Sequence, residues 1–339
     1  MAEIKESDAD DKIQQMMAAA ANWKEGRCAQ RTIVVLDDWI RRLHYQNGVL
    51  ACGTYSGDVQ LVDFETGELY DTWYAELVDA EADDADDDDE IDQEITALHL
   101  SPDAQLVLSG DAAGSVLLRR RGTDNPVMRA THRAAVSGVY WDDDKELVYS
   151  TGVDARFHCH DARGSIEASL TFKEPILSLS VSENYAAVGL SDGGVSICTL
   201  SPLRQIMSFE AHPGPVSAVN LITQSQLLTG TADGQVCLWR LDEDGGSERR
   251  CTTFDGHRGP VVCLHGDGDK VVTGARDGTV RVWDTEEASV RFELRGFTAY
   301  LGSLQVSNDW MLADGTNNAI VLLDFSDDAV SSADEEIEG

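Results

Sequence analysis

The sequence is short of positive charge. It contains 26 Lys and Arg residues against 61 Asp and Glu, which gives a formal net charge of −35. Direct nucleic-acid binding is therefore disfavoured, because contacts to phosphates need clustered basic side chains. The one dense basic cluster, at 119–121, is predicted to be a solvated strand end. We expect basic proteins, not nucleic acids, as partners.

Cysteine pairing and membrane insertion are also poorly supported. The seven cysteines are odd in number and form no C-x-x-C pair, which argues against a disulfide scaffold and a zinc ribbon. No apolar run approaches the ~18 residues of a membrane helix, and the N-terminus is too polar for a secretory signal. We expect a reducing compartment, cytoplasmic and/or nuclear.

Acidic residues gather in one internal stretch. Ten of the fourteen residues at 81–94 are acidic and none is basic. Such a run resists regular structure because its charges repel one another, yet strand-like sequence lies on both sides. We predict an acidic insertion over 79–94, an acidic N-terminal segment over 1–31 and a disordered acidic tail over 326–339.

An internal repeat organises the rest of the chain. Seven segments read as an apolar strand, a tight turn and a second apolar strand, most clearly "TGTADGQVCLWRLD" at 229–242 and "TGARDGTVRVWDTE" at 273–286. The first apolar residues of their final strands are spaced by 57, 41, 38, 41, 44 and 40 residues, and only the interval that holds the acidic stretch is long. These residues are Val59, Val116, Phe157, Val195, Val236, Val280 and Ile320. A period near 41 with four short strands per unit indicates an all-β, seven-bladed β-propeller.

Two copies resemble the WD-repeat family residue by residue. In that family a His, a Ser or Thr, an Asp and a Trp form a buried hydrogen-bond network inside each blade, and buried polar groups do need such partners. A third copy has His132, Ser150 and Asp154, with His160 where Trp is usual. The two full sets are His212, Thr229, Asp233 and Trp239, and His257, Thr273, Asp277 and Trp283.

The resemblance implies how the ring closes and covers 32–325. The strand-like residues 32–36 precede the first copy and would complete the last blade, which removes free sheet edges. Residues 8–23 are predicted to form a short helix, because Ser7 and Asp10 resemble a capping box before an apolar stripe. The propeller itself is expected to be monomeric.

The pattern favours no catalytic or metal chemistry. The His and Asp pairs recur at blade spacing, which favours a structural role over acid–base catalysis. In "HCH" at 158–160 strand alternation turns Cys159 away from both histidines, so three ligands are not brought together. The acidic stretch lacks the ligand spacing of a calcium loop. We expect no catalytic residue, no metal and no cofactor, and therefore no enzyme.

Binding is the function that remains. In the family, partners contact the top face, at positions that flank the first apolar residue of each inner strand, and the acidic insertion would lie beside them. Trp39 and Tyr300 would lie on neighbouring blades as aromatic anchors. The predicted contact residues are Trp39, Arg41, Glu94, Pro175, Leu177, Pro215, Pro260, Val262 and Tyr300.

Three functions stay open. The first is a scaffold for a basic partner, with a histone-binding or chaperone-like role as its specific form. The second is substrate recognition or an adaptor role in a ubiquitin ligase, since "NWKEGRC" at 22–28 faintly resembles the propeller entry of F-box WD-repeat proteins and "HDARG" at 160–164 resembles a W-D-x-R motif. The third, favoured least, is a propeller enzyme.

Overall fold

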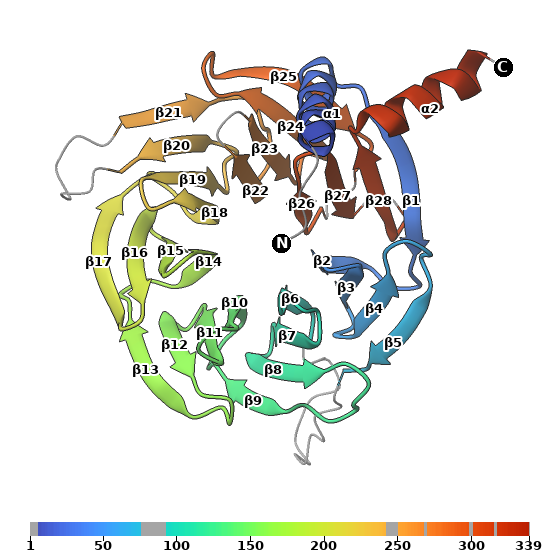
Figure 1. Cartoon of the computed structure of the whole chain (residues 1–339). Helices are drawn as coiled ribbons and strands as arrows, with labels where there is room; N and C mark the ends of the chain where they lie inside the picture. The colour runs from blue at the N-terminus through green and yellow to red at the C-terminus, as the bar shows by residue number, and fades with distance from the viewer. Residues whose placement is uncertain are drawn as a thin grey trace.

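Each repeat folds into one antiparallel, four-stranded sheet, and the sheets follow one another around a ring (Figure 1). The structure is a computed structural model, and it describes residues 6–75, 93–241, 250–267, 270–297, 301–314 and 317–338. Within these ranges, 28 strands form seven sheets. This confirms the predicted seven-bladed propeller. Most of the predicted acidic insertion lies outside the described residues.

Blades 1 to 3 follow in chain order after the first strand. Blade 1 comprises β2 (Ile40–Gln46), β3 (Val49–Thr54), β4 (Val59–Asp63) and β5 (Leu69–Trp73). Blade 2 comprises β6 (Ile95–Leu100), β7 (Leu106–Asp111), β8 (Ser115–Arg120) and β9 (Met128–Thr131). Blade 3 comprises β10 (Val136–Asp142), β11 (Leu147–Gly152), β12 (Arg156–His160) and β13 (Ile166–Thr171).

Blades 4 to 6 repeat the same meander. Blade 4 comprises β14 (Ile176–Ser182), β15 (Tyr185–Leu190), β16 (Gly194–Leu200) and β17 (Leu203–Glu210). Blade 5 comprises β18 (Val216–Thr223), β19 (Gln226–Thr231), β20 (Val236–Arg240) and β21 (Arg250–Phe254). Blade 6 comprises β22 (Val261–Asp267), β23 (Lys270–Ala275), β24 (Thr279–Asp284) and β25 (Ser289–Arg295).

Blade 7 closes the ring with strands from both ends of the chain. Its inner strands are β26 (Leu304–Val306), β27 (Trp310–Asp314) and β28 (Ala319–Asp324). Its outer strand is β1 (Ala29–Val35), which pairs antiparallel with β28 from Ala29↔Asp324 to Val35↔Ala319. The strand predicted at 32–36 thus lies in the expected blade and begins three residues earlier.

Two helices flank blade 7. Helix α1 (Glu6–Glu25) is longer than the predicted 8–23, and it lies in front of the ring in Figure 1. Its buried Trp23 stacks on Phe325 with the ring centroids 3.7 Å apart, and Trp23 Nε1 donates to the backbone oxygen of Asn308 at 2.8 Å. The C-terminal segment is not the predicted disordered tail: Asp327–Glu338 form helix α2, and the acidic residues in its first turn suit a helix N-terminus.

The apolar core lies between neighbouring blades. Alternate residues of each strand face the next sheet, so that Leu228 of blade 5 packs with Val261 and Val271 of blade 6, for example. Burial of these faces stabilises each blade only when its neighbour is present. The ring is therefore a rigid support, and its loops are left free to carry the function.

A β-bulge recurs where the inner strand begins in blades 1 to 6. Register shifts fall at the second residue of each inner strand. A bulge re-aims side chains at the end of a strand. These positions are Arg41, Thr96, Ser137, Leu177, Ser217 and Val262.

Candidate partner-binding face

We define the top face as the side of the ring that carries the turns between the second and third strands of each blade. The loops that lead into the inner strands lie on the same side, since Tyr55 in the β3–β4 turn donates its backbone N–H to the oxygen of Trp39 at 2.8 Å. Helix α1 contacts the β26–β27 turn, which lies on the opposite face. Residues on these two faces therefore cannot contact one partner surface together.

A hydrogen-bond network fixes the top of blade 6. His257 Nε2 lies 2.7 Å from the hydroxyl of Thr273, and Trp283 donates to the same hydroxyl at 2.8 Å. Asp277 lies 3.1 Å from His257 Nδ1 and accepts the backbone N–H of Arg258 at 2.8 Å. Burial acts to raise the pKa of Asp277, but hydrogen bonds from Thr279, Arg258 and His257 outweigh it and hold the pKa at about 2. The four predicted residues are thus joined in one network.

Blade 5 departs from the predicted set at one position. His212 Nε2 lies 2.6 Å from the hydroxyl of Thr229, to which Trp239 donates at 2.8 Å. Asp233 does not reach the imidazole: His212 Nδ1 instead lies 2.9 Å from Oε1 of Gln235. Asp233 accepts a hydrogen bond from the hydroxyl of Thr231. The assignment of Asp233 as the partner of His212 is therefore wrong, because the longer Gln235 side chain fills that place.

Blade 3 builds its network without tryptophan. Ser150 lies 2.9 Å from Nε2 of both His132 and His160, and Asp154 lies 3.0 Å from His132 Nδ1. His160 thus takes the place that an indole occupies in blades 5 and 6. Burial, reinforced by nearby His158, lowers the pKa of His160 to about 4, so this imidazole is neutral at pH 7. The three networks tie an incoming loop to its own blade.

The predicted contact residues of blade 1 form a compact group on the top face. Trp39 is 51% exposed. Arg41 is buried, and its Nε lies 3.0 Å from a carboxylate oxygen of Glu94, so these two residues pair with each other across blades 1 and 2. The prediction placed Arg41 among exposed anchors, and its burial corrects this: the bulge turns its side chain into the blade interface.

Tyr55 belongs to the same group and was missed by sequence reasoning. Its ring lies 5.5 Å from that of Trp39, it is 45% exposed, and the Arg41 guanidinium lies 5.0 Å from its ring centroid. The signal that could have found it is an aromatic residue in the turn "TYSGD", where a solvated turn favours small polar residues. We call Trp39, Tyr55, Arg41 and Glu94 the blade 1 cluster.

The other predicted contacts separate into two sets. Leu177 and Val262 line the central channel, a cavity of about 260 Å³ bounded by the inner strands. Pro215 is exposed, whereas Pro175 and Pro260 are half-buried. Tyr300 lies outside the described residues. Among the described residues, the predicted contacts thus lie together only in the group at blade 1.

The acidic insertion leaves and re-enters the propeller at the blade 1 cluster. Gly57, two residues after Tyr55, has a φ of +89°, and a Cβ there would lie 2.7 Å from the Gln93 oxygen and 3.1 Å from the Ala75 Cβ. Only glycine fits such a close approach. Both flanks of the stretch 76–92 therefore meet beside Tyr55, and this stretch contains eleven acidic residues and no basic one.

The channel contains a half-buried charge next to this cluster. Arg42 donates to the backbone oxygens of Thr96 at 2.6 Å, Arg41 at 2.7 Å and Gly302 at 3.1 Å. These bonds join blades 1, 2 and 7. Asp314 of blade 7 accepts the backbone N–H groups of Gly302 and Ser303, and burial raises the pKa of its carboxyl to about 7.

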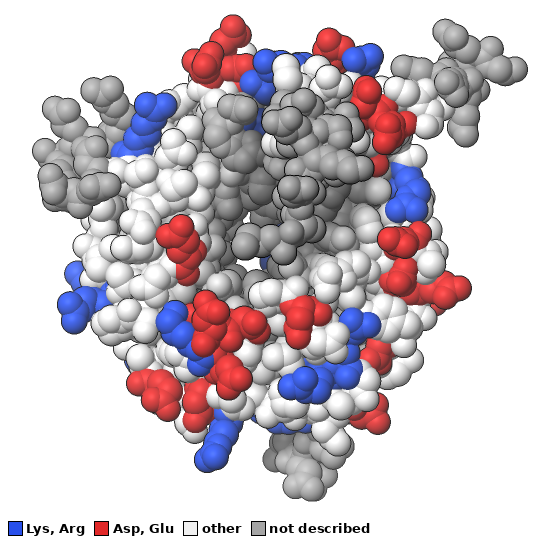
Figure 2. Space-filling view, viewed as in Figure 1, with Lys and Arg blue, Asp and Glu red and all other residues white. Residues whose placement is uncertain are grey.

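The opposite face carries charges of both signs. Figure 2 shows Lys and Arg interspersed with Asp and Glu on the side of the ring that faces the viewer, with acidic side chains gathered over β10 and β11. The β10–β11 turn supplies Asp143, Asp144 and Glu146, together with Lys145. Mixed charge of this kind is typical of a solvated surface.

Comparison with known proteins supports the repeat assignment. The sequence profile described as "WD domain, G-beta repeat" matches residues 203–240 and 248–284. The first match runs from β17 to β20, so one sequence repeat contributes the outer strand of blade 4 and the three inner strands of blade 5. Within the part of the chain that the structure describes, no helix is long and apolar enough to cross a membrane.

Several curated proteins are similar over part of the chain. The "Angio-associated migratory cell protein" of Homo sapiens is 29% identical over 187 residues, which cover 51% of this chain and 37% of that protein. The "Ribosome biogenesis protein YTM1" of Kluyveromyces lactis is 29% identical over 119 residues (32% and 27%), and the "Serine-threonine kinase receptor-associated protein" of Mus musculus is 25% identical over 158 residues (45% and 44%). The matches thus span less than half the length of each of these relatives.

A solved structure shares the architecture. The crystal structure of the computationally designed Ika8 protein superposes with a TM-score of 0.61 at 20% sequence identity, over 87% of this chain and 99% of that chain. At this level of identity the similarity concerns the fold alone.

Proposed function

Because the chain is a seven-bladed β-propeller built from WD repeats, we propose that it is a non-enzymatic protein-interaction scaffold whose top face at blade 1 binds a basic partner. The observation that carries the proposal is the blade 1 cluster beside the two ends of the acidic insertion. Two relatives bear names that refer to ribosome biogenesis and to receptor association, which agrees with a role in complexes.

The aromatic pair supplies the anchoring part of the interface. Trp39 and Tyr55 are each about half exposed, and their ring planes are tilted by 56° to each other, so much of their apolar surface remains available. Large aromatic side chains that are already ordered lose little entropy on binding and dominate interface energies. The Arg41–Glu94 ion pair links blades 1 and 2 next to these two rings.

The acidic insertion supplies the charge. The stretch 76–92 contains eleven acidic residues in the sequence, and its described flanks, Ala75 and Gln93, meet at Gly57, two residues after Tyr55. Exposed charges act at long range and increase the association rate of an oppositely charged partner. A basic protein is the partner class this arrangement suits, and histones are the specific candidate, with a chaperone-like role.

Binding kinetics test both parts with purified core histones as the basic probe. Trp39→Ala and Tyr55→Ala should mainly speed dissociation, by about thirtyfold if each anchor contributes ~2 kcal/mol. Tyr70→Ala is the matched control, because Tyr70 is 42% exposed but lies on the outer strand of blade 1.

Replacement of residues 80–92 by a Gly/Ser linker should mainly slow association. Wild type should associate much faster at low ionic strength, and the linker variant should lose most of this salt dependence, since exposed charges are screened beyond ~8 Å at physiological salt. If Trp39→Ala leaves both rates unchanged in a folded protein, the blade 1 cluster is not the binding site.

A ubiquitin-ligase role remains the alternative, and its residue lies elsewhere. Arg163 of "HDARG" is exposed in the β12–β13 turn, on the face opposite the blade 1 cluster. Under this alternative, Arg163→Ala would abolish co-purification of ligase adaptors while Trp39→Ala would not. The two proposals thus predict opposite results for the same pair of variants.

A further inference from the structure

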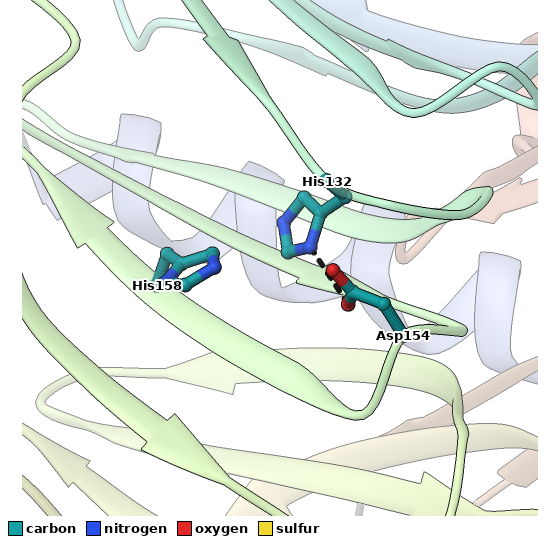
Figure 3. A group of neighbouring side chains, drawn as sticks. All are labelled: His132, Asp154 and His158. Carbon is teal, nitrogen blue, oxygen red and sulfur yellow. Dashed lines mark hydrogen bonds and ion pairs between the residues drawn. The ribbon is translucent and has the colours of Figure 1, made fainter.

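We propose that blade 3 contains a binding site for a divalent transition metal, of which Zn²⁺ is the best match, formed by His132, Asp154 and His158. His132 lies in the loop before β10, Asp154 in the β11–β12 turn and His158 on β12. One potential ligand atom from each residue lies within 4.8 Å of the others. Figure 3 shows His132 hydrogen-bonded to Asp154, with the His158 ring turned toward them.

His158 is the residue that distinguishes this group from an ordinary blade network. Ser150, His132, Asp154 and His160 are joined by hydrogen bonds, although His160 Nδ1 is also left without a partner among the described residues, and His158 is additional to this network. It is only 8% exposed, its ring centroid lies 4.9 Å from that of His132, and its Nδ1 is buried without a hydrogen-bond partner among the described residues. A buried polar atom without a partner calls for a ligand or a second function.

The donor set fits zinc chemistry. Two imidazoles and one carboxylate are ligands that Zn²⁺ accepts at ~2.0–2.2 Å, and three protein ligands leave a fourth position for water. Tetrahedral ligand atoms at such distances lie ~3.4 Å apart, so a spread of at most 4.8 Å closes by a small rotation of His158.

The other two ligands are already held in place. Asp154 accepts the backbone N–H groups of Arg133 at 3.0 Å and Arg156 at 3.2 Å. Ser150 holds the far nitrogen of His132, the kind of outer contact that orients metal-binding histidines. Gly152 makes room for the pair, since a Cβ there would lie 2.7 Å from His132 Nδ1 and 2.8 Å from an Asp154 oxygen.

The substitution of tryptophan by His160 frees His132 for a metal. In blades 5 and 6 the indole can only donate to the threonine hydroxyl, which leaves the hydroxyl hydrogen for the histidine Nε2 and favours a hydrogen on Nδ1. In blade 3 the imidazole of His160 can donate or accept. Ser150 can therefore accept from His132 Nε2, and His132 Nδ1 then presents a lone pair.

Blades 5 and 6 provide internal comparisons. The residue paired with the network hydroxyl is His158 in blade 3, Cys237 in blade 5 and Arg281 in blade 6. The Arg281 guanidinium would repel a cation beside His257 and Asp277. Of the two blades that contain the His–Asp pair, blades 3 and 6, only blade 3 has a neutral third ligand on the neighbouring strand, and only there do we expect a metal site.

Calorimetric titration of the full chain with Zn²⁺ tests the site, in excess Mg²⁺ to occupy the exposed carboxylates. We expect one tight site per chain and an affinity at least tenfold weaker in His158→Ala, which leaves the network of Ser150 intact. Cys251→Ala is the control for a thiolate site, because Cys251 is exposed, and it should bind as the wild type does.

Cobalt substitution tests the same site without a variant. Co²⁺ bound to the wild type should show the visible absorption of a nitrogen- and oxygen-ligated ion without a thiolate charge-transfer band. Equal Zn²⁺ affinity of wild type and His158→Ala would overturn the proposal, as would a thiolate band that Cys251→Ala removes. If His158→Ala unfolds, His158→Asn replaces it in the titration.

Discussion

Asp277 lies 3.1 Å from His257 Nδ1 and joins the loop before β22 to the β23–β24 turn. Asp277→Ala would leave a buried imidazole nitrogen and the backbone N–H of Arg258 without their acceptor. We expect a loss of roughly 1–3 kcal/mol in the free energy of unfolding, measured by denaturant titration. Asp144→Ala, at an exposed position in the β10–β11 turn, is the control and should cost less than ~0.5 kcal/mol.

The same pair should make the stability of blade 6 decrease at low pH. Because the pKa of Asp277 is held at about 2, below its ordinary value of 3.8, its contribution is present above pH 4 and is lost as the pH falls through 2. Asp277→Ala should therefore differ from the wild type in stability at pH 6 and approach it at pH 2. Equal differences at both pH values would contradict this assignment.

In blade 5 the acceptor of the histidine is Gln235, not Asp233. Gln235→Ala should lower the free energy of unfolding by about 1–2 kcal/mol, because His212 Nδ1 loses its partner. Gln235→Glu retains an acceptor and should restore most of this loss. In thermal melts, Gln235→Ala should lower the melting temperature more than Asp233→Asn does.

Trp23 and Trp39 allow one substitution to be compared in two settings. Trp23 is 1% exposed and stacks on Phe325, whereas Trp39 is 51% exposed. Trp23→Ala should cost ~3–5 kcal/mol through lost burial and the cavity that remains, and Trp39→Ala should cost less than ~1 kcal/mol. A loss from Trp23→Ala as small as that from Trp39→Ala, measured by chemical denaturation, would contradict a stabilising role of α1 at blade 7.

Asp314 should make stability depend on pH in the opposite direction from Asp277. Burial raises the pKa of Asp314 from 3.8 to about 7, so the folded chain retains a proton that the unfolded chain loses. The contribution of this proton to the free energy of unfolding is present in full below pH 4. It is lost as the pH rises through 7, by up to ~4 kcal/mol.

Asp314→Asn removes this titration and provides the measurement. Its amide nitrogen cannot accept the N–H of Gly302, so the variant pays a constant penalty, and the informative quantity is the slope. The difference between variant and wild type should shift in favour of the variant from pH 4 to pH 8. A difference that stays constant with pH would mean that Asp314 is ionised throughout this range.

The sequence predicts the ring well because its cause is local and repeated. Turns rich in Gly and Asp recur between alternating strands, and the Trp283 and His257 motif positions fall at the same phase of the repeat. The exchange of Asp233 for Gln235 could not be foreseen, since both side chains lie in one turn and only the backbone decides which reaches His212.

The candidate site was predicted only in part, since it depends on contacts between residues in different turns and strands. Trp39 follows from the position of its strand, but its partner Tyr55 comes from another turn. The bulge that buries Arg41 is a feature of the backbone, and no residue type in the sequence predicts it. His158 meets His132 across 26 positions, and strand alternation alone compared it only with Cys159.

The pairing of Ala29 with Asp324, 295 positions apart, makes blade 7 the slowest part of the molecule to assemble. On a ribosome β1 emerges long before β28, its only partner strand among the described residues, and both of its edges stay unpaired while six blades form. Contacts of such high sequence separation slow folding and expose strands to association with other chains. Yield and solubility of this protein during expression should therefore depend on residues 29–35 more than on any other strand of the propeller.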